Sequence, residues 1–86
     1  MLYELIKGEV SPLSLTKNKE KELLKELEKN KGLVNDIINL YNEEIDILKR
    51  RIDYLKNQED SLFLIKSKEK RVKELSSMKE KIKLIQ

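Results

Sequence analysis

Residues 34–55 read VNDIINLYNEEIDILKRRIDYL, and their apolar side chains recur at alternating steps of four and three. A mean step of 3.5 residues keeps one apolar seam of a helix turned toward a neighbouring helix, as in a heptad coiled coil. The pattern therefore predicts a long helix here. The seam residues, which we expect at or next to a protein interface, are Val34, Ile38, Tyr41, Ile45, Leu48, Ile52 and Leu55.

A second apolar stripe lies beside this seam, at Leu33, Ile37, Leu40, Ile47 and Tyr54. A two-stranded coiled coil uses only the narrow seam, so the wider face predicts more than one neighbour. The segment before it offers only Leu23, Leu24 and Leu27 as apolar anchors. We therefore expect a second chain to cover the remainder, which makes the protein an oligomer, and we leave open whether the two chains are identical.

The composition limits the fold class. The chain has 86 residues, of which 41% are charged and 38% hydrophobic, with two glycines and one proline. This mixture with helical periodicity is typical of long helices, and the length suits one small domain. We predict an all-α fold over residues 1–86, made of long amphipathic helices in a helical bundle or a coiled-coil assembly.

Glycine, proline and hydroxyl residues divide the first half of the chain. We expect a short helix over residues 1–8, ended by Gly8, and a linker over residues 9–15 that contains Pro12. The linker is apolar enough to lie against the bundle. A helix is expected at about 16–31, capped by Thr16, and Gly32 is a plausible end to it.

The second half is predicted to hold helices at 33–56 and 58–85. The seam falters over residues 57–61, which are polar throughout. Either Asp60 or Ser61 caps a separate last helix, or one helix continues through a shift in phase. Because no glycine or proline forces a stop, we favour a continuous or kinked helix.

Charge separates along the chain. Residues 35–60 have a formal charge of minus three, whereas residues 66–86 have plus five. A basic helix can contact nucleic-acid phosphates, but the few aromatic residues and the net charge of plus three favour a solvated lysine-rich face. At most we expect weak, salt-sensitive DNA binding. The candidate contacts are Lys66, Lys68, Lys70, Arg71 and Lys73.

The residue inventory argues against an enzyme. Histidine and cysteine are both absent, which removes the commonest general base and metal ligands. Two glycines cannot supply a glycine-rich phosphate loop. We therefore expect no catalytic, cofactor-binding or metal-binding residues. No apolar run is long enough to span a membrane and the N-terminus lacks a signal-peptide layout, so a cytoplasmic location is expected.

Two segments carry a family resemblance. Residues 2–16, LYELIKGEVSPLSLT, resemble the N-terminus of archaeal-type GINS subunits, where a short leucine-rich helix leads into a Gly-Glu-aliphatic-Ser-Pro sequence before the first long helix. Residues 65–75, IKSKEKRVKEL, are similar to a late helix of that family, with Lys68, Arg71 and Val72 at its recurring basic and aliphatic positions. The family's small β-rich domain has no counterpart here.

The resemblance implies a non-catalytic helical scaffold. It would be a subunit of the GINS complex, the tetramer that joins the MCM helicase and a RecJ-like partner in DNA replication, and it would require a different chain to complete its interface. Two alternatives stay open. One is a homo-oligomeric coiled-coil adaptor or chaperone, and the other is a small basic nucleic-acid-binding helical protein.

Overall fold

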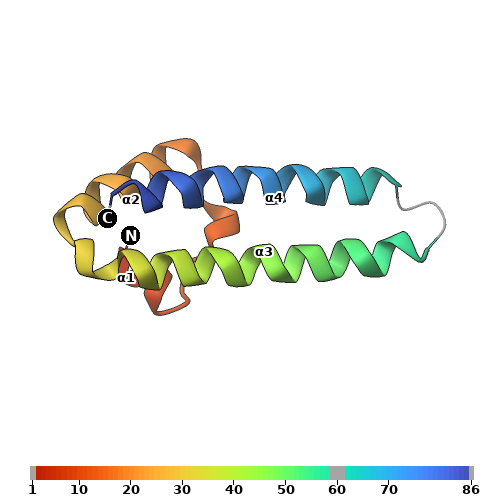
Figure 1. Cartoon of the computed structure of the whole chain (residues 1–86), viewed down its shortest axis with the longest axis horizontal. Helices are drawn as coiled ribbons and strands as arrows, with labels where there is room; N and C mark the ends of the chain where they lie inside the picture. Colours follow the sequence, from red (N-terminus) through yellow and green to blue (C-terminus); the bar gives the residue numbers. More distant parts are fainter. Residues whose placement is uncertain (1, 59–61, 86) are drawn as a thin grey trace.

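The computed structural model describes residues 2–58 and 62–85, and within them the regular elements are all helical. The expected all-α fold is confirmed. The molecule is 47 Å long and 20 Å across (Figure 1). The elements in chain order are α1 (Leu2–Ile6), the 3₁₀ turn η1 (Pro12–Ser14), α2 (Lys17–Lys29), the 3₁₀ turn η2 (Lys31–Leu33), α3 (Val34–Lys56) and α4 (Leu62–Lys83).

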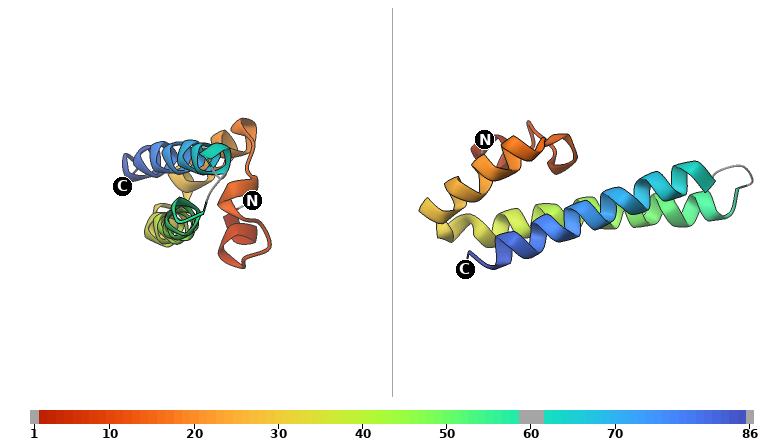
Figure 2. Two further views of the ribbon diagram at one scale, coloured as in Figure 1. Left: turned by 90° about the vertical axis from the view of Figure 1, so that its right-hand side faces the viewer. Right: turned by 90° about the horizontal axis from the view of Figure 1, so that it is seen from above.

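Helices α3 and α4 form an antiparallel hairpin and lie side by side along their length (Figures 1 and 2). The continuous or kinked helix that we favoured is therefore wrong. Folding back gives the α3 seam a covering helix from its own chain, and Leu75, Met78 and Ile82 of α4 are buried. The alternative caps, Asp60 and Ser61, lie outside the described residues.

Gly8 ends α1, as expected. Its φ of +82° is the left-handed conformation that favours glycine. The N–H of Gly8 donates to the carbonyl oxygen of Leu5 at 3.1 Å, and the N–H of Glu9 donates to that of Glu4 at 2.9 Å. These two bonds make a Schellman motif, which satisfies carbonyl groups at the end of the helix.

The linker packs against the core, as its apolar residues predicted. The Ser11 hydroxyl accepts from the N–H of Leu13 at 3.2 Å and starts the η1 turn. Pro12 and Leu15 are buried, while Val10 and Leu13 are half-buried against the core. The linker therefore fixes where α2 begins.

Helix α2 lies across the end of the hairpin at which the chain passes from α2 into α3 (Figure 2). The Thr16 hydroxyl accepts from the N–H of Lys19 at 3.3 Å and caps the helix, as predicted. Leu23 and Leu27 are fully buried. The helix ends before Asn30, and Gly32 lies within η2, where the chain turns into α3.

The core occupies the half of the hairpin that α1, η1 and α2 cover. It is a single cluster in which residues from α1 and α2 pack with residues from both arms of the hairpin. The outer half of the hairpin, called here the tip, lacks this cover and consists of α3 and α4 alone (Figure 1). The base is thus a small bundle and the tip a two-helix projection.

Candidate functional site

The predicted interface seam lies inside the chain. Five of its seven residues are buried, and Ile38 and Leu55 are half-buried. Helix α4, together with α1 and η1, packs on α3 in the same molecule. The seam therefore contacts neighbouring helices as predicted, but those helices belong to its own chain, and an uncovered seam is no longer a reason to invoke a second one.

Tyr41 sits in this core with a polar group that the surroundings do not satisfy. Its side chain is 1% exposed, and its hydroxyl has no hydrogen-bond partner among the described residues. Burial raises the pKa of the Tyr41 phenol well above its ordinary range. The Glu20 carboxylate adds to this rise and the Arg71 guanidinium opposes it. The phenol therefore packs as a neutral aromatic group, consistent with its place on the seam.

The tip exposes large apolar side chains. Phe63 is 82% exposed and Tyr54 66%, and Leu62 and Leu64 are also largely exposed. We expected Tyr54 to pack at a helix contact, but the covering elements stop short of it. Ile47, one heptad before Tyr54 on the same stripe, is 39% exposed. The second stripe is thus covered at the base and bare toward the tip.

A groove of about 830 Å³ runs between the start of α2 and α4. Three of the five candidate nucleic-acid contacts, Lys70, Arg71 and Lys73, line its α4 wall, whereas Lys66 and Lys68 lie outside it. Lys17 and Lys21 face them from α2. The remaining lining residues are Leu15, Thr16, Glu20, Leu24, Glu74, Ser77, Met78 and Lys81.

Arg71 is the groove cation whose side chain is held by hydrogen bonds. Its guanidinium donates to the carbonyl oxygen of Leu13 in η1 and, at 2.7 Å, to the Glu74 carboxylate one helical turn on. Arg71 therefore ties to α4 the linker that leads directly into α2, the other wall of the groove. Lys17 and Lys21 were missed by the sequence analysis, since they join this site only because α2 lies on α4, whereas Lys81 belongs to the basic C-terminal run noted there.

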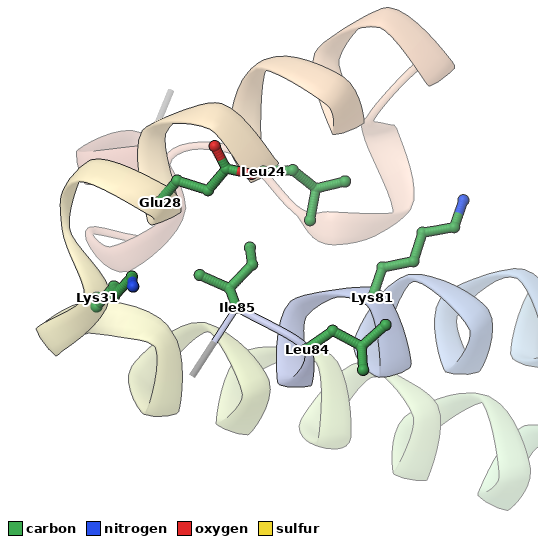
Figure 3. Close-up of a pocket in the computed structure, with 6 residues that line it drawn as sticks. All are labelled: Leu24, Glu28, Lys31, Lys81, Leu84 and Ile85. Carbon is green, nitrogen blue, oxygen red and sulfur yellow. The ribbon is translucent and has the colours of Figure 1, made fainter.

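A smaller hollow continues the groove toward the base (Figure 3). It shares Leu24 and Lys81 with the groove and adds Glu28, Lys31, Leu84 and Ile85. The Leu84 side chain is 87% exposed at its edge. The two hollows together form a trough along the α2–α4 contact.

The tip and the groove offer apolar surface and positive charge. Within residues 2–58 and 62–85, no group of three or more acidic side chains is placed to hold a metal ion. No described helix is long and apolar enough to cross a membrane. The tip can bury apolar surface against a partner, and the groove can hold negative charge.

Comparison with protein-family models, curated proteins and solved structures finds no match to this chain.

Proposed function

We propose that this chain is a non-catalytic helical interaction protein that docks its hairpin tip onto a different protein chain. The observation that carries the proposal is the exposure of Tyr54, Leu62, Phe63 and Leu64 at one end of the molecule. Such a cluster exposes on the order of 500 Å², since an aromatic residue alone offers about 150–250 Å². Large exposed apolar surface gathered at one end of a monomer often marks an interaction site.

The arrangement of the apolar side chains around the tip favours a different chain over a second copy. Two tips facing each other would bury about 1,000 Å² in total, below the roughly 1,200–2,000 Å² of stable interfaces. Leu62, Phe63 and Leu64 are consecutive on a helix, so their side chains point about 100° apart. A partner that buries all three must surround the tip and extend along the hairpin, which a matching tip cannot do.

The sequence resemblance names the kind of assembly. A GINS-like subunit completes its interface with non-identical chains, which agrees with a tip that a second, matching tip cannot surround. We therefore propose that the assembly is a GINS-like complex in DNA replication. The support is the resemblance at residues 2–16 and 65–75 together with the exposed tip.

The test is site-specific photocrosslinking in the cells that make this protein. Phe63 is replaced by the photoreactive amino acid p-benzoylphenylalanine, and Tyr3 is the matched control, because it is 68% exposed and lies on α1 away from the tip. We expect one discrete adduct from position 63 and none from position 3. The crosslinked chain is then co-purified with the protein, and Phe63→Glu should abolish the complex while Tyr3→Glu retains it.

The outcomes separate the alternatives. A heteromeric complex that depends on Phe63 supports the proposal, and a replication-complex subunit in the adduct supports the GINS-like assignment. An adduct between two copies of this chain would favour the homo-oligomeric adaptor instead. Equal adducts from both positions, or none, would overturn docking through the tip.

A further inference from the structure

The basic groove between α2 and α4 concentrates the positive charge of the molecule. Six cationic side chains and two glutamates line it, a formal balance of plus four. The whole chain carries only plus three. The rest of the molecule is therefore slightly acidic, so a polyanion is attracted to this groove rather than to the surface in general.

Most of these cationic side chains have no hydrogen-bond or ion-pair partner among the described residues. Arg71 is held by Glu74 and the Leu13 carbonyl oxygen. The groove lysines, by contrast, have side chains that make no hydrogen bond or ion pair with any residue that the structure describes. They are Lys17, Lys21, Lys70, Lys73 and Lys81. A bound anion can therefore pair with them without first breaking an internal ion pair.

The floor of the groove offers little to an apolar ligand. Leu15 is 7% and Met78 2% exposed, so both are already buried by the chain itself, and only Leu24 is partly open. An amphipathic peptide would gain little from this floor. The affinity of any ligand here must come mainly from charge.

The cations are spread along the groove instead of gathered at one point. Eleven residues separate Lys70 from Lys81, which is about 16 Å along α4. Phosphates follow one another about every 3.4 Å along one strand of B-DNA. At that spacing the groove has room for about five phosphates, which makes it too long for a single ion.

We propose that this groove binds the phosphodiester backbone of a nucleic acid. The ligand lies along the α2–α4 trough, and lysines from both walls pair with successive phosphates. Nucleic-acid binding in the groove is independent of docking through the tip. The proposed site has two walls, from α2 and α4, whereas the sequence analysis considered the basic C-terminal helix alone. Because the contacts go to phosphates, the groove does not distinguish base sequence.

The test is fluorescence anisotropy of the purified chain with a labelled 20-nucleotide oligo(dT) at about 50 and 200 mM salt. Neutralising four phosphates of a single strand, as many as the net charge of plus four in the groove, predicts a roughly 50-fold weakening between the two salt concentrations. The variant Lys17→Glu/Lys70→Glu changes one lysine on each wall and should weaken binding at least about tenfold. The control variant Lys49→Glu/Lys56→Glu makes the same charge change on exposed positions of α3 outside the groove.

The control should bind within about threefold of the unchanged protein, and circular dichroism checks that both variants fold. Oligo(U) and a DNA duplex test whether RNA and double-stranded backbones are also held. Equal losses in the two variants would overturn the proposal, as would absence of binding to every nucleic acid at low salt. Equally tight binding of labelled poly-glutamate would reassign the groove to acidic proteins.

Discussion

At the scale of single residues, Tyr41 is the buried group whose chemistry the core satisfies least. Its ring fills the centre of the α3 seam while its hydroxyl has no hydrogen-bond partner among the described residues. Burying an unpaired hydroxyl costs free energy, whereas an apolar group of the same shape does not incur that cost. The ring therefore stabilises the fold and the hydroxyl opposes it.

We predict that Tyr41→Phe raises the free energy of unfolding by about 1 kcal/mol at pH 7. Urea denaturation followed by circular dichroism measures the change. A loss of 1 kcal/mol or more would show that the hydroxyl has a partner that stabilises the folded chain.

The same substitution tests the pKa of the phenol. Below the ordinary value of 10.0, the folded and unfolded chains both keep the proton, so stability does not depend on this group. Above it the unfolded chain loses the proton first, because burial holds the folded pKa higher. The free energy of unfolding should then fall by up to about 1.4 kcal/mol per pH unit. The advantage of Tyr41→Phe should widen accordingly between pH 10 and 11, and an advantage that stays constant would argue against a raised pKa.

The two glycines, Gly8 and Gly32, allow a controlled test of the backbone conformation at the end of α1. Nothing lies within 4 Å of a side-chain carbon added at either position, but only Gly8 has a positive φ. Gly8→Ala should lower the free energy of unfolding by about 1–2 kcal/mol, the cost of the left-handed conformation. Gly32→Ala should leave it unchanged or raise it by up to about 1 kcal/mol. Equal effects in urea denaturation would contradict the Schellman ending of α1.

At the scale of elements, periodicity predicted where helices lie but not how they are arranged. The alternating steps placed a helix over residues 33–56, and α3 spans Val34–Lys56. The reversal before α4 could not be predicted, because a periodic stripe requires a neighbour without fixing its direction or whether it belongs to the same chain. Residues 57–61 contain no glycine or proline to mark a turn.

The α3 face can be tested with three isoleucines on one helix. Ile45 is 5% and Ile52 7% exposed, whereas Ile47 is 39% exposed. Ile45→Asp or Ile52→Asp places an unpaired charge in the hairpin, and the expected cost of more than about 4 kcal/mol is enough to unfold a chain of this size. Ile47→Asp should remain folded. Circular dichroism distinguishes these results, and a folded Ile52→Asp variant would contradict the packing of α3 on α4.

At the scale of the whole molecule, the candidate sites depend on tertiary contacts that the sequence does not encode locally. The basic run of α4 was visible, but Lys17 and Lys21 lie about 50 residues away and join it only because the linker carries α2 across α4. The exposure of Phe63 could not be predicted from the sequence either. Whether an apolar residue of a helix is exposed depends on how far the covering segments reach, which the sequence does not give.

Both proposed sites depend on the chain reversing between α3 and α4, since a continuous helix would have neither a tip nor the same groove. The most direct test is a spin-label distance between cysteines replacing Asn42 and Lys79, whose side chains are hydrogen-bonded at 3.0 Å across the hairpin. Labelled protein is diluted with excess unlabelled protein so that only distances within one chain are measured. A control pair at Asn42 and Asp53 lies on α3 alone and should give the same distance in either arrangement.

With helix axes packed at about 8–10 Å, the hairpin predicts a label separation on the order of 10–20 Å for positions 42 and 79. A continuous helix would place these positions about 55 Å apart, since 37 residues rise about 1.5 Å each. A short distance that persists on dilution supports the hairpin, its exposed tip and its basic groove. A distance near 55 Å, or a short distance that disappears on dilution, would contradict them.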